Sequence, residues 1–117
     1  MLNISDQSPL GRLAVSGAIT QREYEAGRRW HNIYSQYLRC IGAPAPYGSA
    51  EMPGDDECET WTALFKRGRQ LLEAKGKRVF HAVNAIAVYE EPEEYGDSEF
   101  KVAAAKVGLS ALADNPI

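Results

Sequence analysis

Two charged segments carry most of the polar chemistry that this sequence offers. The first, the basic segment, spans positions 66–78 and holds six of the thirteen Lys and Arg residues beside one acid. Cations concentrated in this way can neutralise nucleic-acid phosphates, and a solvated helix surface explains them about equally well. The candidate nucleic-acid contacts are Lys66, Arg67, Arg69, Lys75, Lys77 and Arg78, together with Arg28 and Arg39 at helical spacing.

The second charged segment, the acidic segment, spans positions 90–99 and contains six acids. Opposite charge poles on one small protein steer its encounter with charged partners. We therefore expect this segment to bind a protein, and an acidic strip can also imitate nucleic acid in a partner's cationic groove. The candidate protein contacts are Glu90, Glu91, Glu93, Glu94 and Tyr95.

The cysteines and histidines do not have the spacing of a metal site. Structural zinc sites use close ligand pairs such as Cys-x2-Cys, whereas His31, Cys40, Cys58 and His81 are nine or more residues apart. Because no signal peptide is recognisable, we expect a reducing, cytoplasmic location and two free thiols. His81 lies beside an apolar helix face and is expected to be a structural histidine.

Motifs for catalysis or cofactor binding are absent from the sequence. It has no GxxxxGK[ST] loop, no GxGxxG turn after a strand, no GxSxG elbow and no pair of carboxylates at a suitable spacing. We therefore expect a protein that is not an enzyme and that binds neither a cofactor nor a metal.

The composition is that of one soluble globular domain. The chain has 117 residues, 44% of them hydrophobic and 25% charged, and no apolar run approaches the roughly 18 residues that span a bilayer. We therefore expect no membrane contact. The net charge of −3 means that nucleic acid could bind only at a segregated basic patch.

Apolar residues recur at steps of three and four, which predicts an all-α bundle of about five helices. A capping box at Thr20 and Glu23 starts the longest helix, Gly42 ends it, and Asp56 is the expected cap of the next. We expect a disordered segment at 1–7 and a single domain at 8–114 with an irregular loop at 43–54. The predicted helices span 8–16, 20–41, 56–75, 77–90 and 98–113.

Large apolar side chains on these helices form the predicted core. A core this small leaves aromatic surface exposed, so self-association as a homodimer is also expected. The predicted core residues are Leu10, Leu13, Ile19, Tyr24, Trp30, Ile33, Tyr34, Tyr37, Ile41, Trp61, Leu64, Phe65, Leu71, Leu72, Val79, Phe80, Val83, Ile86, Phe100, Val107 and Leu112.

Residues 100–110 match the first helix and turn of a helix-turn-helix motif. Such a motif needs a following recognition helix of about eight residues, and only 111–114 remain before Asn115-Pro116. Those residues also lack side chains that read base edges. We therefore expect one continuous amphipathic helix that tolerates Gly108.

Three stretches resemble small helical proteins of alphaproteobacterial prophages, including the uncharacterised domain of gene-transfer-agent regulators. They are Leu10–Arg29, which fits LxRL…G-x-I-[ST]-x-x-[QE]-[YF]-x-A-G, then Val79–Tyr89, and Val107–Asp114 with its GLxxLA-type pattern. The resemblance implies a fold similar to sigma-factor region four and a regulator that contacts DNA or RNA polymerase. The acidic segment departs from that family, because it would repel a DNA backbone.

Two functions from different classes follow from these features. The first is a phage-type regulator that acts on transcription through DNA or RNA polymerase contacts. The second is a protein-binding inhibitor or adaptor that acts on a host or phage protein complex.

Overall fold

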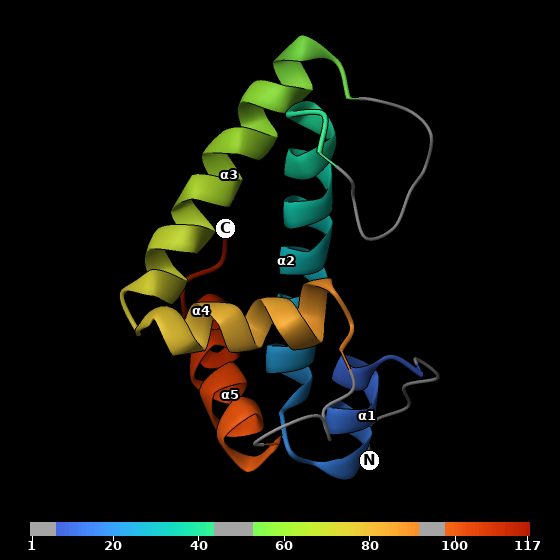
Figure 1. The fold of residues 1–117 in the computed structure, drawn as a ribbon, viewed down its shortest axis with the longest axis vertical. Coiled ribbons are helices and arrows are strands. Elements are labelled where there is room, and N and C mark those ends of the chain that lie inside the picture. Colours follow the sequence, from blue (N-terminus) through green and yellow to red (C-terminus); the bar gives the residue numbers. More distant parts are fainter. Residues whose placement is uncertain (1–6, 44–52, 92–97) are drawn as a thin grey trace.

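The computed structural model describes residues 7–43, 53–91 and 98–117 (Figure 1). Within these residues the backbone is helical and contains no strand, so the predicted all-α fold is confirmed. The predicted disorder at 1–7 and the loop at 43–54 fall almost entirely outside the described residues. The elements are α1 (Pro9–Ser16), α2 (Gln21–Cys40), α3 (Asp55–Glu73), α4 (Lys77–Val83), a π-helical segment η1 (Asn84–Val88) and α5 (Ser98–Asp114).

Local sequence signals account for most of the helix ends. The capping box of α2 is present, since the Glu23 N–H donates to Thr20 Oγ1 and the Thr20 N–H donates to Glu23 Oε1. Gly42 follows α2 at φ 72°, and the next N–H donates back to the Leu38 carbonyl as in a Schellman motif. The predicted cap of α3 was wrong by two residues: Gly54 is the cap and Asp56 lies inside the first turn, where the helix dipole favours its charge.

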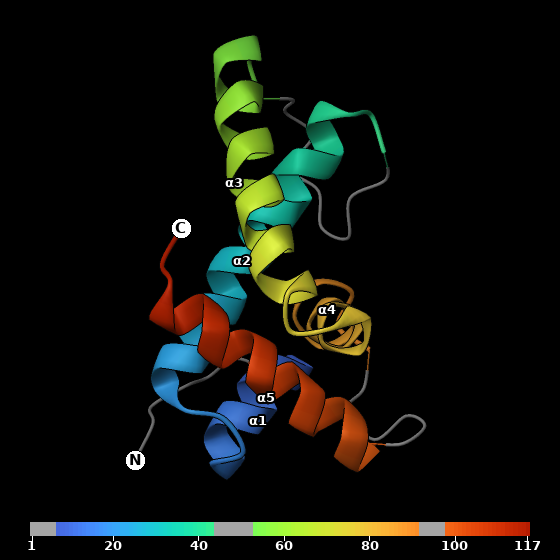
Figure 2. The same cartoon turned by 90° about the vertical axis from the view of Figure 1, so that its left-hand side faces the viewer.

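The helices form a base and a projecting arm (Figures 1 and 2). In the base, α4 crosses α5 steeply, and α1 packs beside the first turns of α2. The outer halves of α2 and α3 continue beyond the base as an antiparallel pair, which we call the α2–α3 arm (residues 34–40 and 55–67). A disulfide between Cys40 and Cys58 joins its outer end.

This disulfide shows that the prediction of free thiols was wrong. Cys40 is the last residue of α2 and Cys58 is in the first turns of α3, and antiparallel packing brings their Cα atoms within 5.5 Å. That separation is ordinary for a disulfide. The sequence contained both cysteines, but their pairing depends on how two helices pack.

Close helix contacts in the core require glycine at two crossings. A Cβ on Gly108 would come within 2.5 Å of Val83 Cγ2, and one on Gly68 would collide with the ring of Trp30. α5 is continuous through Gly108, as predicted. The absence of a side chain at Gly108 lets α5 lie close to α4. Trp30 itself is only 1% exposed and stacks on Phe65.

The helix predicted at 77–90 changes type at Asn84. From there the Tyr89 N–H donates to the Asn84 carbonyl five residues back, which is the π-helical pattern. The wider turn places three consecutive side chains, Ile86, Ala87 and Val88, in the core.

The predicted core is right in its centre and wrong at three positions. Leu10, Trp30, Leu72, Val83 and Ile86 are among the predicted residues that are buried. Three others are exposed: Ile41 by 57%, Phe100 by 75% and Val107 by 47%. In α5 the predicted Leu112 is buried, and so are Ala105, Leu109 and Ala111, which were not predicted.

Candidate functional site

The helix α5 has two apolar sides, and only one of them faces the core. Ala105, Leu109 and Leu112 are buried against the rest of the base. Phe100, Ala103 and Val107 recur at steps of three and four on the other side. A helix that is apolar all round is normally covered on all sides. The second side of α5 is therefore the first candidate for a binding surface.

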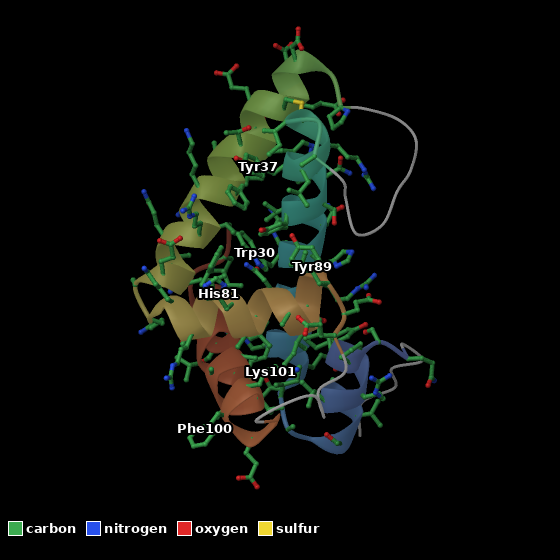
Figure 3. All side chains as sticks on the ribbon, in the orientation of Figure 1. Trp30, Tyr37, His81, Tyr89, Phe100 and Lys101 are labelled. Carbon is green, nitrogen blue, oxygen red and sulfur yellow. A yellow bond between two sulfur atoms is a disulfide. The ribbon has the colours of Figure 1, made fainter. Side chains whose placement is uncertain are left out.

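This second side forms one wall of an open groove of about 970 Å³, which we call the α4–α5 groove. The other wall comes from α4 and η1, and Tyr34 of α2 lies at one end. Figure 3 shows Phe100 projecting from the free end of α5, with Lys101 beside it and His81 on α4. The lining residues are Tyr34, Arg78, Phe80, His81, Ala82, Asn84, Ala85, Tyr89, Glu91, Phe100, Lys101, Ala103, Ala104 and Val107.

The groove has apolar walls and a mainly cationic edge. Arg78 of α4 and Lys101 of α5 are the cations of this edge, and His81, three residues after Arg78, faces the same side of α4 as Arg78. Glu91 is the one acid among the described lining residues. At the Tyr34 end, burial and then a hydrogen bond with Tyr89 raise the pKa of Tyr34 to about 12. Tyr34 therefore stays a neutral phenol at physiological pH.

Buried hydrogen bonds fix the wall that η1 contributes. The Trp30 Nε1–H donates to Asn84 Oδ1 at 2.8 Å inside the core. His31 Nδ1 lies 2.7 Å from the carbonyl of Ala87, so the Nδ1–H tautomer donates to a carbonyl at the end of the π-helical segment. Because the partners of both bonds lie on α2, the groove wall is tied to the longest helix of the molecule. Its shape is therefore preformed.

The structure distributes the basic segment over several directions. Arg67 and Arg69 are two residues apart on α3 and so point about 200° apart around the helix. Arg69 forms an ion pair with Glu73, and this hydrogen bond raises its pKa. Lys75, Lys77 and Arg78 are exposed around the turn between α3 and α4. The six predicted cations do not form one patch.

The other predicted contacts divide between described and undescribed residues. Arg28 and Arg39 are eleven residues apart on one side of α2, and Arg39 is partly buried. Glu90 adopts a left-handed φ of 54° after η1, and Glu91 reaches the groove. Glu93, Glu94 and Tyr95 lie outside the described residues. The structure therefore connects only Arg78 and Glu91 of the predicted contacts with the groove.

Sequence reasoning missed the groove because it assigned Phe100 and Val107 to the core. The signal was present: apolar residues occupy nearly the whole circumference of the predicted last helix, which is more than one packing side needs. His81 is also placed differently, since it is exposed at the groove and is not a structural histidine.

The described residues also bear on metal sites and membrane-spanning helices. Among the described residues, no group of three or more His, Cys, Asp or Glu could hold a metal ion. Within the same ranges, none of the helices combines the length and the apolar character that crossing a membrane requires. Comparison of the chain with protein-family models, with curated proteins and with solved structures finds no significant match.

Proposed function

We propose that this protein is a protein-binding module whose α4–α5 groove holds one amphipathic helix of a partner protein. The observation that carries the proposal is the second apolar side of α5, on which Phe100 is 75% and Val107 47% exposed. Helix-in-groove recognition uses apolar anchors at such three- and four-residue steps. A preformed groove reduces the ordering cost of binding.

Charge at the groove edge specifies the partner further. Arg78 and His81 follow one another along α4, so a bound helix presents a side chain to each of them. A partner helix with acidic residues beside its apolar stripe complements this edge. A groove that holds such a helix favours the predicted inhibitor or adaptor over a protein that binds DNA directly. DNA is acidic as well, but it has no apolar stripe to fill the groove.

A library of displayed helical peptides tests this proposal. We expect selection on the immobilised protein to enrich amphipathic helices with acidic flanks. Ala103→Arg places a long cation in the groove and should weaken binding of the selected peptides by about tenfold or more. The matched control is Ala63→Arg, the same change on the outer side of α3, which should leave affinity unchanged. Equal weakening by both changes, or enrichment of peptides without a helical apolar pattern, would refute the proposal.

Nucleic-acid binding is a second candidate, and the cations at the α3–α4 turn favour it. Lys75, Lys77 and Arg78 are exposed within four positions of one another. Such a cluster supports weak contacts to phosphates that do not depend on sequence. This second candidate is the regulator that the family resemblance implies, and its partner is DNA or a polymerase complex.

Its test is a titration with duplex DNA at about 50 and 200 mM salt. We expect Lys77→Glu to weaken any binding seen at the lower salt, and Arg12→Glu, the same type of change on α1, to leave it unchanged. Absence of binding by the unmodified protein at the lower salt removes this candidate.

A further inference from the structure

The α2–α3 arm has an apolar stripe of its own, separate from the groove. Both views show the outer halves of α2 and α3 standing clear of α1, α4 and α5 (Figures 1 and 2). On α3, Glu57, Trp61, Leu64 and Arg67 follow one another at steps of four, three and three, so they share one side of the helix. Trp61 and Leu64 pack against the core with part of their surface, and the rest is exposed.

Charge along α3 is divided between its two halves. The first five residues carry only acids as charged groups: Asp55, Asp56, Glu57 and Glu59. Residues 60–65 are uncharged, and Lys66, Arg67 and Arg69 follow. If two copies of this helix pack antiparallel, the acidic end of each lies beside the basic part of the other. Parallel packing would instead place like charges together.

The same antiparallel arrangement also brings the apolar residues of the two copies into contact. If the two-fold axis passes near residue 62, Trp61 of each copy packs on Leu64 of the other. Glu57 of each copy then lies beside Arg67 of the other, because each is five residues, about 7.5 Å of helix, from the axis. A two-fold interface needs exactly this kind of self-complementary surface. The four arm helices would share one apolar core, as in a four-helix bundle.

We propose that the α2–α3 arm is a homodimerisation surface that binds a second copy of this chain in antiparallel orientation. Trp61 and Leu64 form the centre of the contact, and Glu57–Arg67 ion pairs lie on either side of it. The proposal does not depend on the α4–α5 groove, because Glu57, Trp61, Leu64 and Arg67 are not among the residues that line it.

Sedimentation of the full chain over a dilution series tests this proposal. We expect the mass to rise from 12.9 kDa toward twice that value with concentration. Glu57→Lys and Arg67→Glu should each raise the dimer dissociation constant by about tenfold or more. Glu59→Lys and Lys66→Glu make the same charge changes on the far side of α3, and we expect neither to affect the mass. Circular dichroism verifies that every variant stays helical.

Mixing the variants tests the orientation directly. Glu57→Lys places cations at both ends of the stripe and Arg67→Glu places acids at both ends, so each variant repels itself. An equimolar mixture of the two should form the dimer again, as should the double variant carrying both changes. A monomer at every concentration would overturn the proposal. So would equal effects of the test and control variants, or a mixture that stays monomeric.

Discussion

At the scale of single residues, Glu23 links two helices through one carboxylate. Its Oε1 accepts hydrogen bonds from the Thr20 N–H at 2.8 Å and from Lys106 Nζ of α5 at 2.7 Å. Burial of Glu23, which is 6% exposed, opposes ionisation. The bonds from Lys106 and Thr20 outweigh this effect, so the pKa of Glu23 lies below its ordinary value of 4.5. The ionised carboxylate therefore stabilises the contact between α2 and α5.

This arrangement predicts a pH-dependent effect of Glu23→Gln. A lowered folded-state pKa stabilises the protein fully above the ordinary pKa, and this contribution is lost as the pH falls through the folded-state value. We expect the variant to be less stable by about 1 kcal/mol at pH 7, and this difference to shrink as the pH falls below 4.5 and through the lowered pKa of Glu23. Glu25→Gln on the exposed side of α2 serves as the control. Thermal unfolding of the variant and the unmodified protein measures this difference in stability. A difference that persists unchanged at low pH would contradict this account.

At the scale of elements, the disulfide constrains the two helices of the arm. It joins positions 18 residues apart, at the end of α2 and the start of α3. A cross-link over a chain of this length lowers the entropy of the unfolded state. The disulfide lies at the outer end of the arm, away from α1, α4 and α5 (Figure 1).

We expect replacement of both Cys40 and Cys58 by Ser to reduce the free energy of unfolding by about 3 kcal/mol. Urea titrations should show the same loss for the unmodified protein in a reductant, and no effect of the reductant on the double variant. If the oxidised protein and the double variant unfold at the same urea concentration, the disulfide does not stabilise the fold.

The sequence predicts the ends of a helix where contacts between neighbouring residues determine them. Thr20 with Glu23 and the glycine at 42 act over a few residues, so the ends of α2 follow from the sequence. The exposure of Phe100 could not be predicted in this way, because both sides of α5 are apolar and tertiary packing decides which side faces inward. The π-helical turn at Asn84 and the pairing of Cys40 with Cys58 likewise depend on contacts between distant helices.

At the scale of the whole molecule, the proposed contacts occupy different parts of the structure. The groove lies in the base between α4 and α5, whereas the antiparallel contact uses the arm. A dimer joined through its arms would therefore leave two grooves available, one on each base. Two linked grooves bind a partner with two helical segments more tightly than one groove does.

The binding surface that we propose is the α4–α5 groove. Amide ¹H–¹⁵N spectra of the labelled protein, titrated with a selected amphipathic peptide, test it most directly. We expect the largest shift changes at Tyr89, Phe100, Ala103 and Val107, and small changes at Ala63 and elsewhere on the outer side of α3. If the peptide binds and its largest changes fall on the arm or on α1, the groove is not the site.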